Sequence, residues 1–252
     1  MAYSSRKKIV ALIPCYNEEY SIGQVIESFP REKINNRGFE LEIMVIDNNS
    51  RDRTAQVARD FGATVIQEPK KGKGNAIRRG FYSIPADSDY VVMLDGDSTY
   101  RPEEILRLVD FLDSDFCSVV IGSRLDGWMR DGSMKTFNRL GNRIYSFLVR
   151  FFYNANVTDA LTGYFAWKRE AVERLRPHLT SNGFDIEMEM ITKMARLKEE
   201  ICSVPISYHL RVGKTNLNPV FDSVLILKTL VCNLYWRPGR IGAAQGILHK
   251  AN

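Results

Sequence analysis

The chain has 252 residues, of which 44% are hydrophobic and 26% are charged, so it can form one large domain and is not a disordered chain. Its net charge of +5 at pH 7 suits phosphate-bearing ligands, nucleic acid or anionic lipid, without choosing among them. The three histidines and four cysteines are scattered, which argues against a zinc enzyme, and no run of about 20 apolar residues predicts a transmembrane helix.

The first half of the chain alternates short apolar runs with stretches of helical spacing. We expect strands at 9–13, 42–47, 64–67, 90–94 and 117–122, and helices at 21–29, 54–61, 75–83 and 103–112. Strands that alternate with helices form parallel βαβ units. The sequence therefore predicts an α/β fold with a doubly wound, mostly parallel sheet.

The second half is less regular. Helices are expected at 135–153, from residue 169, and at 184–196, with strands at 164–167 and 201–206. The segment 220–236 has apolar residues near one helical face but also contains Asp222, Lys228 and Asn233. It therefore predicts an amphipathic C-terminal helix and not a membrane span.

Polar residues follow every expected strand of the first half. In an open parallel sheet, ligands bind outside the carboxyl ends of the strands, so these residues are expected to converge on one site. The strands are followed by Pro14-Cys15-Tyr16-Asn17-Glu18, Asp47-Asn48-Asn49-Ser50, Glu68-Pro69-Lys70-Lys71-Gly72-Lys73-Gly74, Asp95-Gly96-Asp97 and Ser123-Arg124.

The Asp95-Gly96-Asp97 turn is the sharpest of these signals. Two carboxylates that flank a glycine after a buried strand can bind one hard divalent cation, Mg²⁺ or Mn²⁺. Gly96 allows the backbone to approach closely, and Thr99 can add a third metal contact. The alternative interpretation is an ordinary acidic turn that caps a helix.

Two further loops predict contacts to a nucleotide. Asp47 ends a strand where a carboxylate commonly accepts hydrogen bonds from a ribose or base, although it can instead cap the next helix. Lys73 and Gly74 open a helix, and a helix N-terminus attracts phosphate. Neither a P-loop nor a G-x-G-x-x-G sequence follows any strand, which argues against a kinase or a dehydrogenase.

Together these motifs resemble those of the inverting family-2 glycosyltransferases of GT-A fold, over roughly residues 9–215. Within that family the chain is most similar to the polyprenyl-phosphate sugar synthases, such as dolichyl-phosphate mannose or glucose synthase. The residues that carry this second likeness are Gly122-Ser123-Arg124, Asn138-Arg139, Gly141-Asn142, Asp159-Ala160-Leu161-Thr162-Gly163-Tyr164 and Arg211-Val212-Gly213-Lys214-Thr215.

The resemblance implies a role for each matching residue. Asp95 and Asp97 would hold the metal, and Arg124, Arg139 and Arg211 would bind the acceptor phosphate. Thr99 stands where some mannose synthases carry Gln, and Asn48-Asn49-Ser50 replaces the commoner Asp-Gly-Ser. The residues expected to bind the donor are Pro14, Tyr16, Asn17, Glu18, Asp47, Asn49, Lys73, Gly74, Asp95, Gly96 and Lys214.

The chemistry of the acceptor decides whether the enzyme needs a base. A sugar hydroxyl needs a carboxylate to take its proton, and Asp159 and Glu187 can act as such bases or can orient other groups. A phosphate monoester is largely dianionic near neutral pH and needs only positioning and cations. The apolar face of the C-terminal helix, followed by Tyr235, Trp236 and Arg237, suits a membrane interface, but core packing or a dimer contact would also explain it.

We therefore expect a metal-dependent hexosyltransferase that moves sugar from a UDP- or GDP-sugar to a polyprenyl phosphate. Its catalytic domain would span residues 1–215 and an amphipathic interfacial helix and tail residues 216–252, peripheral on the cytoplasmic face of a membrane. Homo-oligomers are compatible with this prediction. The alternatives are a soluble glycosyltransferase acting on a glycan hydroxyl and an inactive nucleotide-sugar-binding subunit. Nucleic-acid binding is not expected, because no basic stripe is interleaved with stacking aromatics.

Overall fold

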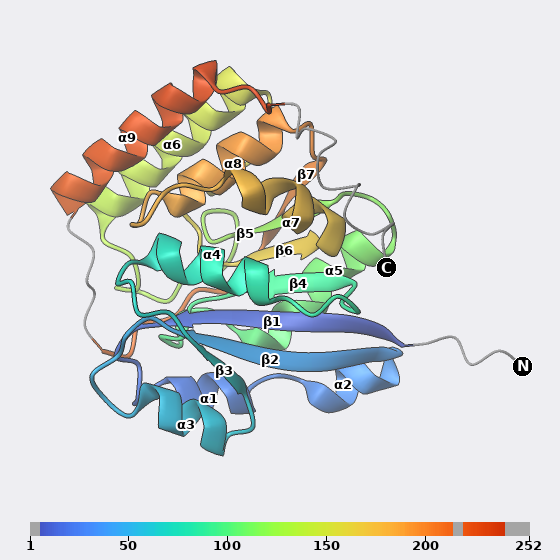
Figure 1. The fold of residues 1–252 in the computed structure, drawn as a ribbon. Coiled ribbons are helices and arrows are strands. Elements are labelled where there is room, and N and C mark those ends of the chain that lie inside the picture. Colours follow the sequence, from blue (N-terminus) through green and yellow to red (C-terminus); the bar gives the residue numbers. More distant parts are fainter. Residues whose placement is uncertain (1–5, 214–218, 240–252) are drawn as a thin grey trace, which may run out of the picture.

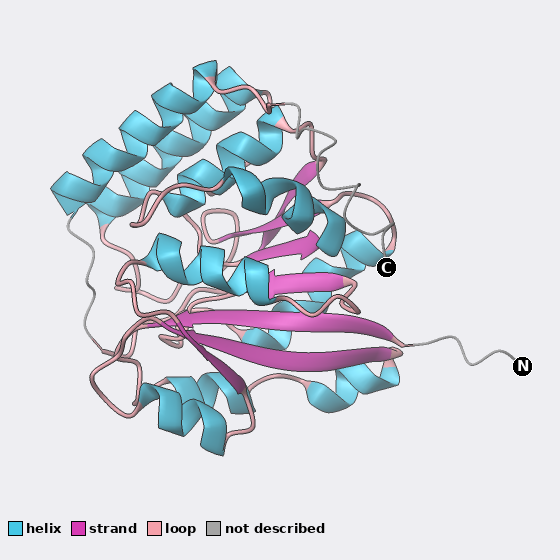
Figure 2. Cartoon of the chain, in the orientation of Figure 1, coloured by secondary structure: helices cyan, strands magenta, loops and turns pink. Residues whose placement is uncertain are grey.

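A computed structural model describes residues 6–213 and 219–239 of the chain, which form a sheet with helices on both of its faces (Figures 1 and 2). The strands of its seven-stranded sheet are β1 (Lys7–Cys15), β2 (Phe39–Asp47), β3 (Thr64–Gln67), β4 (Tyr90–Met93), β5 (Val119–Ser123), β6 (Phe165–Lys168) and β7 (Ile201–Pro205). They lie in the order β3-β2-β1-β4-β6-β5-β7. The predicted α/β fold with a mostly parallel sheet is confirmed.

Only β6 runs against the other described strands, and it is antiparallel to both β4 and β5. The remaining neighbours pair in parallel, from β3-β2-β1-β4 on one side to β5-β7 on the other. The order of the strands reverses beside β1, which lies between β2 and β4. Such a reversal opens a crevice at the carboxyl ends of the strands, where ligands bind in this class of sheet.

One face of the sheet is covered by α1 (Ile22–Glu27), α2 (Arg31–Asn36), α3 (Thr54–Asp60) and α5 (Ile105–Asp113). The other face is covered by α4 (Lys73–Ser83), α6 (Thr136–Tyr153), α7 (Arg169–Leu175), α8 (Ile186–Arg196) and α9 (Pro219–Tyr235). Alternate residues of β1 pack into the two layers: Ile9, Ala11 and Ile13 face the first, and Val10 and Leu12 face the second. This alternation follows from the two-residue period of a strand.

Two departures from the expected elements, and one helix end that was expected, have local causes. The short helix α2 was not predicted, since its sequence REKINN is polar and only Ile34 of it is buried. The helix expected at 103–112 begins as a 3-10 turn, Pro102–Glu104, and continues as α5. Helix α6 ends as predicted near Tyr153, because Asn154 adopts a left-handed conformation with φ of 51° that closes the helix.

Helix α9 packs against α6 and α8 and shares their core. Ile226 and Leu230 are buried in it, while the side chain of Asn233 donates to Thr192 at 2.8 Å and Tyr145 donates to the carbonyl of Ser223 at 2.9 Å. Figure 1 shows α9 lying alongside α6. The predicted division between residues 215 and 216 lies outside the described residues. None of the described helices is long and apolar enough to cross a membrane.

Candidate active site

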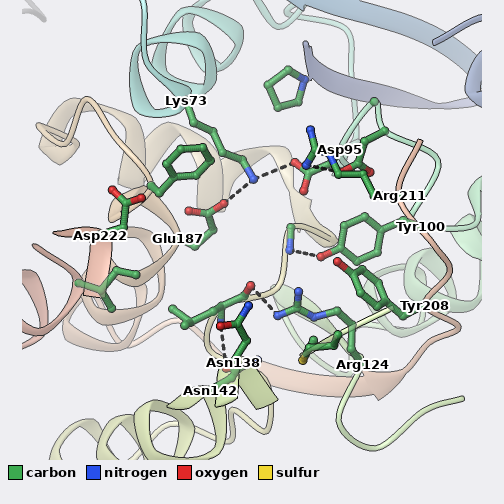
Figure 3. A pocket seen from close by; sticks show the side chains of 18 of the residues that line it. Lys73, Asp95, Tyr100, Arg124, Asn138, Asn142, Glu187, Tyr208, Arg211 and Asp222 are labelled. Atoms are coloured by element: carbon green, nitrogen blue, oxygen red, sulfur yellow. Dashed lines mark hydrogen bonds and ion pairs between the residues drawn. The ribbon is translucent and has the colours of Figure 1, made fainter. Parts of the chain in front are cut away.

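A cavity of about 530 Å³ lies at the carboxyl edge of the sheet, beside the point where the strand order reverses. Figure 3 shows side chains from several elements pointing into it. Of the residues predicted to form the site, ten line the cavity: Pro14, Tyr16, Glu18, Lys73, Asp95, Gly96, Asp97, Arg124, Glu187 and Arg211. The loops that follow β1, β4 and β5 therefore do converge, as the strand-end rule predicts.

The two aspartates of the turn have different surroundings. Asp97 is only 3% exposed, and its Oδ1 accepts hydrogen bonds from the backbone N–H and the hydroxyl of Thr99 at 3.0 and 2.5 Å. Its Oδ2 lies 2.8 Å from Nη1 of Arg211. Burial and the neighbouring Asp95 raise the pKa of Asp97, against the opposing effect of Arg211. Thr99 thus orients the carboxylate of Asp97.

Asp95 is held by a lysine that bridges two carboxylates. Nζ of Lys73 lies 2.8 Å from Oδ1 of Asp95 and 2.6 Å from Oε1 of Glu187 (Figure 3). Burial by itself would lower the pKa of Lys73, but the two carboxylates raise it above its ordinary value, so this lysine stays charged. Burial raises the pKa of Glu187 although Lys73 opposes the shift.

The backbone around Asp95 leaves no room for larger residues. A Cβ atom at Gly163 would lie 2.4 Å from Oδ2 of Asp95, and one at Gly96 would lie 2.5 Å from Sγ of Cys15. Gly163 therefore brings the chain before β6 close to Asp95, and Gly96 lets the turn itself pack against Cys15. The N–H of Gly163 donates to the hydroxyl of Tyr100 at 2.6 Å, which holds Gly163 beside Asp95.

Glu18 and Arg211 form a second bridge across the cavity. Nη2 of Arg211 lies 2.6 Å from Oε1 of Glu18, so this arginine joins Glu18 to Asp97. Burial raises the pKa of Glu18 to about 7, and Arg211 opposes that shift. The structure thus pairs a residue after β1 with one after β7, which the sequence did not predict.

Arg124 is buried in a bidentate ion pair. Its Nε and Nη2 each lie 2.8 Å from an oxygen of the fully buried Asp159, and its guanidinium lies 5.1 Å from the ring of Tyr208. Asn142 also donates to Asp159, at 2.5 Å. Asp159 does not line the cavity. It orients Arg124, which is one of the two roles that the sequence left open for it.

The loops after β1, β2 and β3 contain several further polar groups near the cavity. The hydroxyl of Tyr16 accepts a hydrogen bond from Lys71 at 2.9 Å. Asn48 accepts from the N–H of Gly72 at 2.7 Å and so fixes the start of α4. Asp47 is buried, and its Oδ1 has no hydrogen-bond partner among the described residues. An unpaired buried carboxylate oxygen is costly, but Asp47 does not line the cavity, so no ligand is assigned to this oxygen.

Some predicted site residues do not line the cavity. Asn17 and Asn49 are exposed and have positive φ values of 57° and 61°, so they shape their loops. Gly74 is buried at the start of α4, where its N–H donates to the carbonyl of Asn182. Arg139 is exposed on α6, and Lys214 lies outside the described residues.

Sequence reasoning also missed residues that line the cavity. Tyr208 follows β7, so the strand-end rule would have found it had it been applied to the last strand. Lys71 and Asn48 lie in loops that were singled out, but neither was chosen. The start of α9 contributes Ser223 and Ile226, for which the sequence gives no signal, because only the folded chain brings that helix to the site.

The residues present are suited to a divalent metal. Mg²⁺ is usually held by one or two carboxylates together with substrate phosphates and water, and Asp95 and Asp97 supply two carboxylates at one end of an open cavity. Across the described residues no group of three or more His, Cys, Asp and Glu side chains is placed to hold a metal. The described part of the chain therefore supplies only two carboxylates to a metal, and the oxygens of a bound diphosphate can supply further ligands.

Comparison with known proteins identifies the family. A model described as "Glycosyl transferase family 2" matches residues 10–176. The chain belongs to glycosyl transferase family 2. It is 36% identical over 224 residues to "Glycosyltransferase AglJ" of Haloferax volcanii, a match that covers 88% of this chain and 70% of that protein. The prediction that the chain is a glycosyltransferase is confirmed.

Two other relatives come from the same organism. "Low-salt glycan biosynthesis hexosyltransferase Agl6" is 33% identical over 236 residues, but this glycosyltransferase spans only 55% of the length of Agl6. "Dolichyl-phosphate hexose transferase" is 30% identical over 223 residues, with 88% of this chain and 92% of the relative covered. The predicted likeness to polyprenyl-phosphate sugar transferases is confirmed.

A solved structure supports the fold. Glucosyl-3-phosphoglycerate synthase from Mycobacterium tuberculosis, in complex with Mn²⁺, uridine-diphosphate and phosphoglyceric acid, superposes with a TM-score of 0.69. The match covers 93% of this chain and 80% of that one at 22% sequence identity. At this identity the likeness concerns the fold alone, and it confirms the predicted GT-A architecture.

Proposed function

We propose that this glycosyltransferase moves a hexose from a nucleotide diphosphate sugar to a polyprenyl phosphate at a membrane surface, with Mg²⁺ or Mn²⁺ bound by Asp95 and Asp97. The observation that carries the proposal is the continuity between the cavity and an exposed apolar surface. Phe137, Asn138 and Gly141 of α6 and Ile226 of α9 line the cavity together with residues of the loops after β1 and β2.

The apolar surface continues from the cavity along both helices. We call it the α6–α9 face, and it consists of the exposed side chains of Phe137, Leu140, Ile144, Phe147, Phe151, Phe152, Phe221, Val224, Leu227, Val231 and Tyr235. A large exposed apolar patch on a monomer marks an interaction site. We infer that it meets lipid, because a polyprenyl chain whose phosphate lies in the cavity needs an apolar path out of it.

The cations of the cavity suit a phosphate acceptor. Arg124 lines the cavity as a fixed positive charge, because Asp159 holds its Nε and Nη2, and a positive charge there attracts a phosphate group. An acceptor phosphate is already largely dianionic and needs no base. On the donor side, a divalent metal supplies Lewis-acid stabilisation of the leaving diphosphate. Lys73 is placed to offset negative charge there.

The names of the relatives support the same acceptor. One is a dolichyl-phosphate hexose transferase, and an undecaprenyl-phosphate mannosyltransferase of Micrococcus luteus is 26% identical over 211 residues. One observation favours the second candidate, a transferase that acts on a glycan hydroxyl. Glu187 lies in the cavity with a raised pKa, as a general base would.

The experiment that tests the proposal supplies the purified chain with Mn²⁺ or Mg²⁺, labelled UDP- or GDP-sugars, and polyprenyl phosphate in detergent. Labelled sugar in the lipid fraction supports the proposal. Donor consumption with label only on a glycan acceptor would replace it with the second candidate. Binding of donor without any turnover would indicate an inactive nucleotide-sugar-binding subunit.

A further inference from the structure

Each aspartate of the metal-binding turn is held by a cation from a distant part of the chain. Lys73, at the start of α4, contacts Asp95 at 2.8 Å, and Arg211, after β7, contacts Asp97 at 2.8 Å. These two contacts come from opposite sides of the cavity. Lys73 is 15% exposed and Arg211 32% exposed, so both ion pairs are partly shielded from water.

The cations occupy the oxygens that a metal would need. Oδ1 of Asp97 already accepts two hydrogen bonds from Thr99, which leaves Oδ2 for a metal, and Arg211 holds that oxygen. On Asp95, Oδ2 packs beside Gly163 and Oδ1 is paired with Lys73. A divalent cation that binds both aspartates therefore competes directly with the lysine and the arginine.

The charges in the cavity indicate under which conditions a metal can displace Lys73 and Arg211 from the aspartates. Arg211 is also paired with Glu18, and Lys73 is also paired with Glu187. Each cation therefore keeps one carboxylate partner when it leaves its aspartate. The diphosphate of a donor offers further anionic oxygens, and charge-assisted hydrogen bonds to phosphate are strong. When metal and diphosphate bind together, the metal takes the aspartate oxygens and the phosphate oxygens take up Lys73 and Arg211. A metal that binds alone displaces the two cations from the aspartates and offers them no new partner.

We propose that Lys73 and Arg211 are internal counter-ions that keep the aspartate oxygens occupied until a divalent metal arrives together with a nucleoside diphosphate group. They are positioning residues whose side chains pass from aspartate to phosphate. The backbone beside Arg211 stays in place, because the N–H of Val212 donates to the carbonyl of Asp97 at 3.0 Å. The inference rests on the proposed function for the nature of the donor, but its metal-binding consequence needs no transfer reaction.

The consequence is measurable as binding of Mn²⁺ alone. Free Mn²⁺ is followed by electron paramagnetic resonance during titration of the purified protein at pH 8, above the pKa of about 7 of Glu18. Removing one charge-assisted contact with Arg211→Gln is expected to tighten Mn²⁺ binding on the order of tenfold. Arg211→Lys, which keeps the positive charge, is expected to stay near the wild type.

A matched control separates direct competition from general charge. Lys71 lines the same cavity and pairs with Tyr16, so Lys71→Gln removes one charge without freeing an aspartate. It is expected to leave Mn²⁺ affinity within about twofold of the wild type, since its effect is only long-range and screened. Adding UDP or GDP is expected to strengthen Mn²⁺ binding more in the wild type than in Arg211→Gln.

Two results would overturn the inference. One is equal or weaker Mn²⁺ binding by Arg211→Gln in a protein that unfolds at the wild-type temperature. The other is an equal gain in Lys71→Gln, which would mean that only the net charge matters. Failure of lipid transfer alone would count against the proposed function and not against this inference, because the titration contains no acceptor.

Discussion

The buried pair of Arg124 and Asp159 allows a quantitative prediction. Asp159 is fully buried, and it accepts hydrogen bonds from Nε, Nη2 and the backbone N–H of Arg124, each at 2.8 Å. Removing one partner of a buried ion pair leaves an uncompensated charge and costs about 3–5 kcal/mol. The isosteric Asp159→Asn keeps some polar contact, so we expect a loss of stability at the lower end, about 3 kcal/mol.

The assay is thermal unfolding at several pH values. For a chain of this size each kcal/mol corresponds to roughly 2–4 °C, so Asp159→Asn is expected to lower the unfolding temperature by about 6–12 °C at pH 7. Burial alone would raise the pKa of Asp159, but Arg124 and Asn142 hold it below its ordinary value. The stabilisation is therefore complete above the unfolded pKa of about 3.9, and it is lost as the pH falls through the lower folded value.

An exposed pair provides the control. Arg37 and Asp110 are also joined by two contacts, at 2.6 and 3.3 Å, but both side chains are more than 40% exposed. Asp110→Asn is expected to cost less than about 1 kcal/mol. Equal shifts for Asp159→Asn and Asp110→Asn, or a shift for Asp159→Asn that does not shrink in acid, would refute the reasoning.

Three further predictions concern the site and its surroundings. Gly163→Ala places a methyl group against Asp95 and is expected to lower Mn²⁺ affinity in the presence of UDP or GDP. The control is Gly141→Ala, whose methyl group meets nothing within 4 Å, and it is expected to leave the Mn²⁺ affinity unchanged in the same titration. Glu187→Gln is expected to lower kcat with a phosphate acceptor by less than about tenfold, and a loss of about 100-fold or more would mark it as a general base. Phe147→Ser, on the α6–α9 face, is expected to weaken co-sedimentation with anionic lipid vesicles on the order of tenfold, and an equal effect of Phe116→Ser, on an exposed aromatic elsewhere, would contradict the membrane assignment.

The strands and the edge that carries the site could be predicted from the sequence. Runs such as 9–13 and 90–94 are apolar throughout, which is the pattern of a strand buried on both faces, and polar loops follow them. The Asp95-Gly96-Asp97 turn was found because it comes directly after such a strand. Local patterns of this kind depend on residues that are neighbours in the chain, so they are visible before folding.

Contacts between distant segments could not be predicted. Arg211 lies 193 positions from Glu18, and no local pattern signals that they pair. The antiparallel direction of β6 was also hidden, because a buried run as short as Phe165–Lys168 carries no pattern that distinguishes a parallel from an antiparallel strand. Asp159 was left as base or orienter, and only its contacts with Arg124 distinguish the two roles. Arg139, chosen by resemblance as an acceptor-binding residue, is exposed on α6.

The most direct test of the proposed function is transfer of labelled hexose to polyprenyl phosphate by the wild type and by Asp97→Asn, each with Mn²⁺ and with a chelator. The account predicts label in the lipid fraction only for the wild type with metal, because Asp95 and Asp97 are the proposed protein ligands of that metal. Lipid labelling that persists in Asp97→Asn or with the chelator would contradict the metal assignment. Donor turnover by the wild type with no label on lipid would contradict the acceptor.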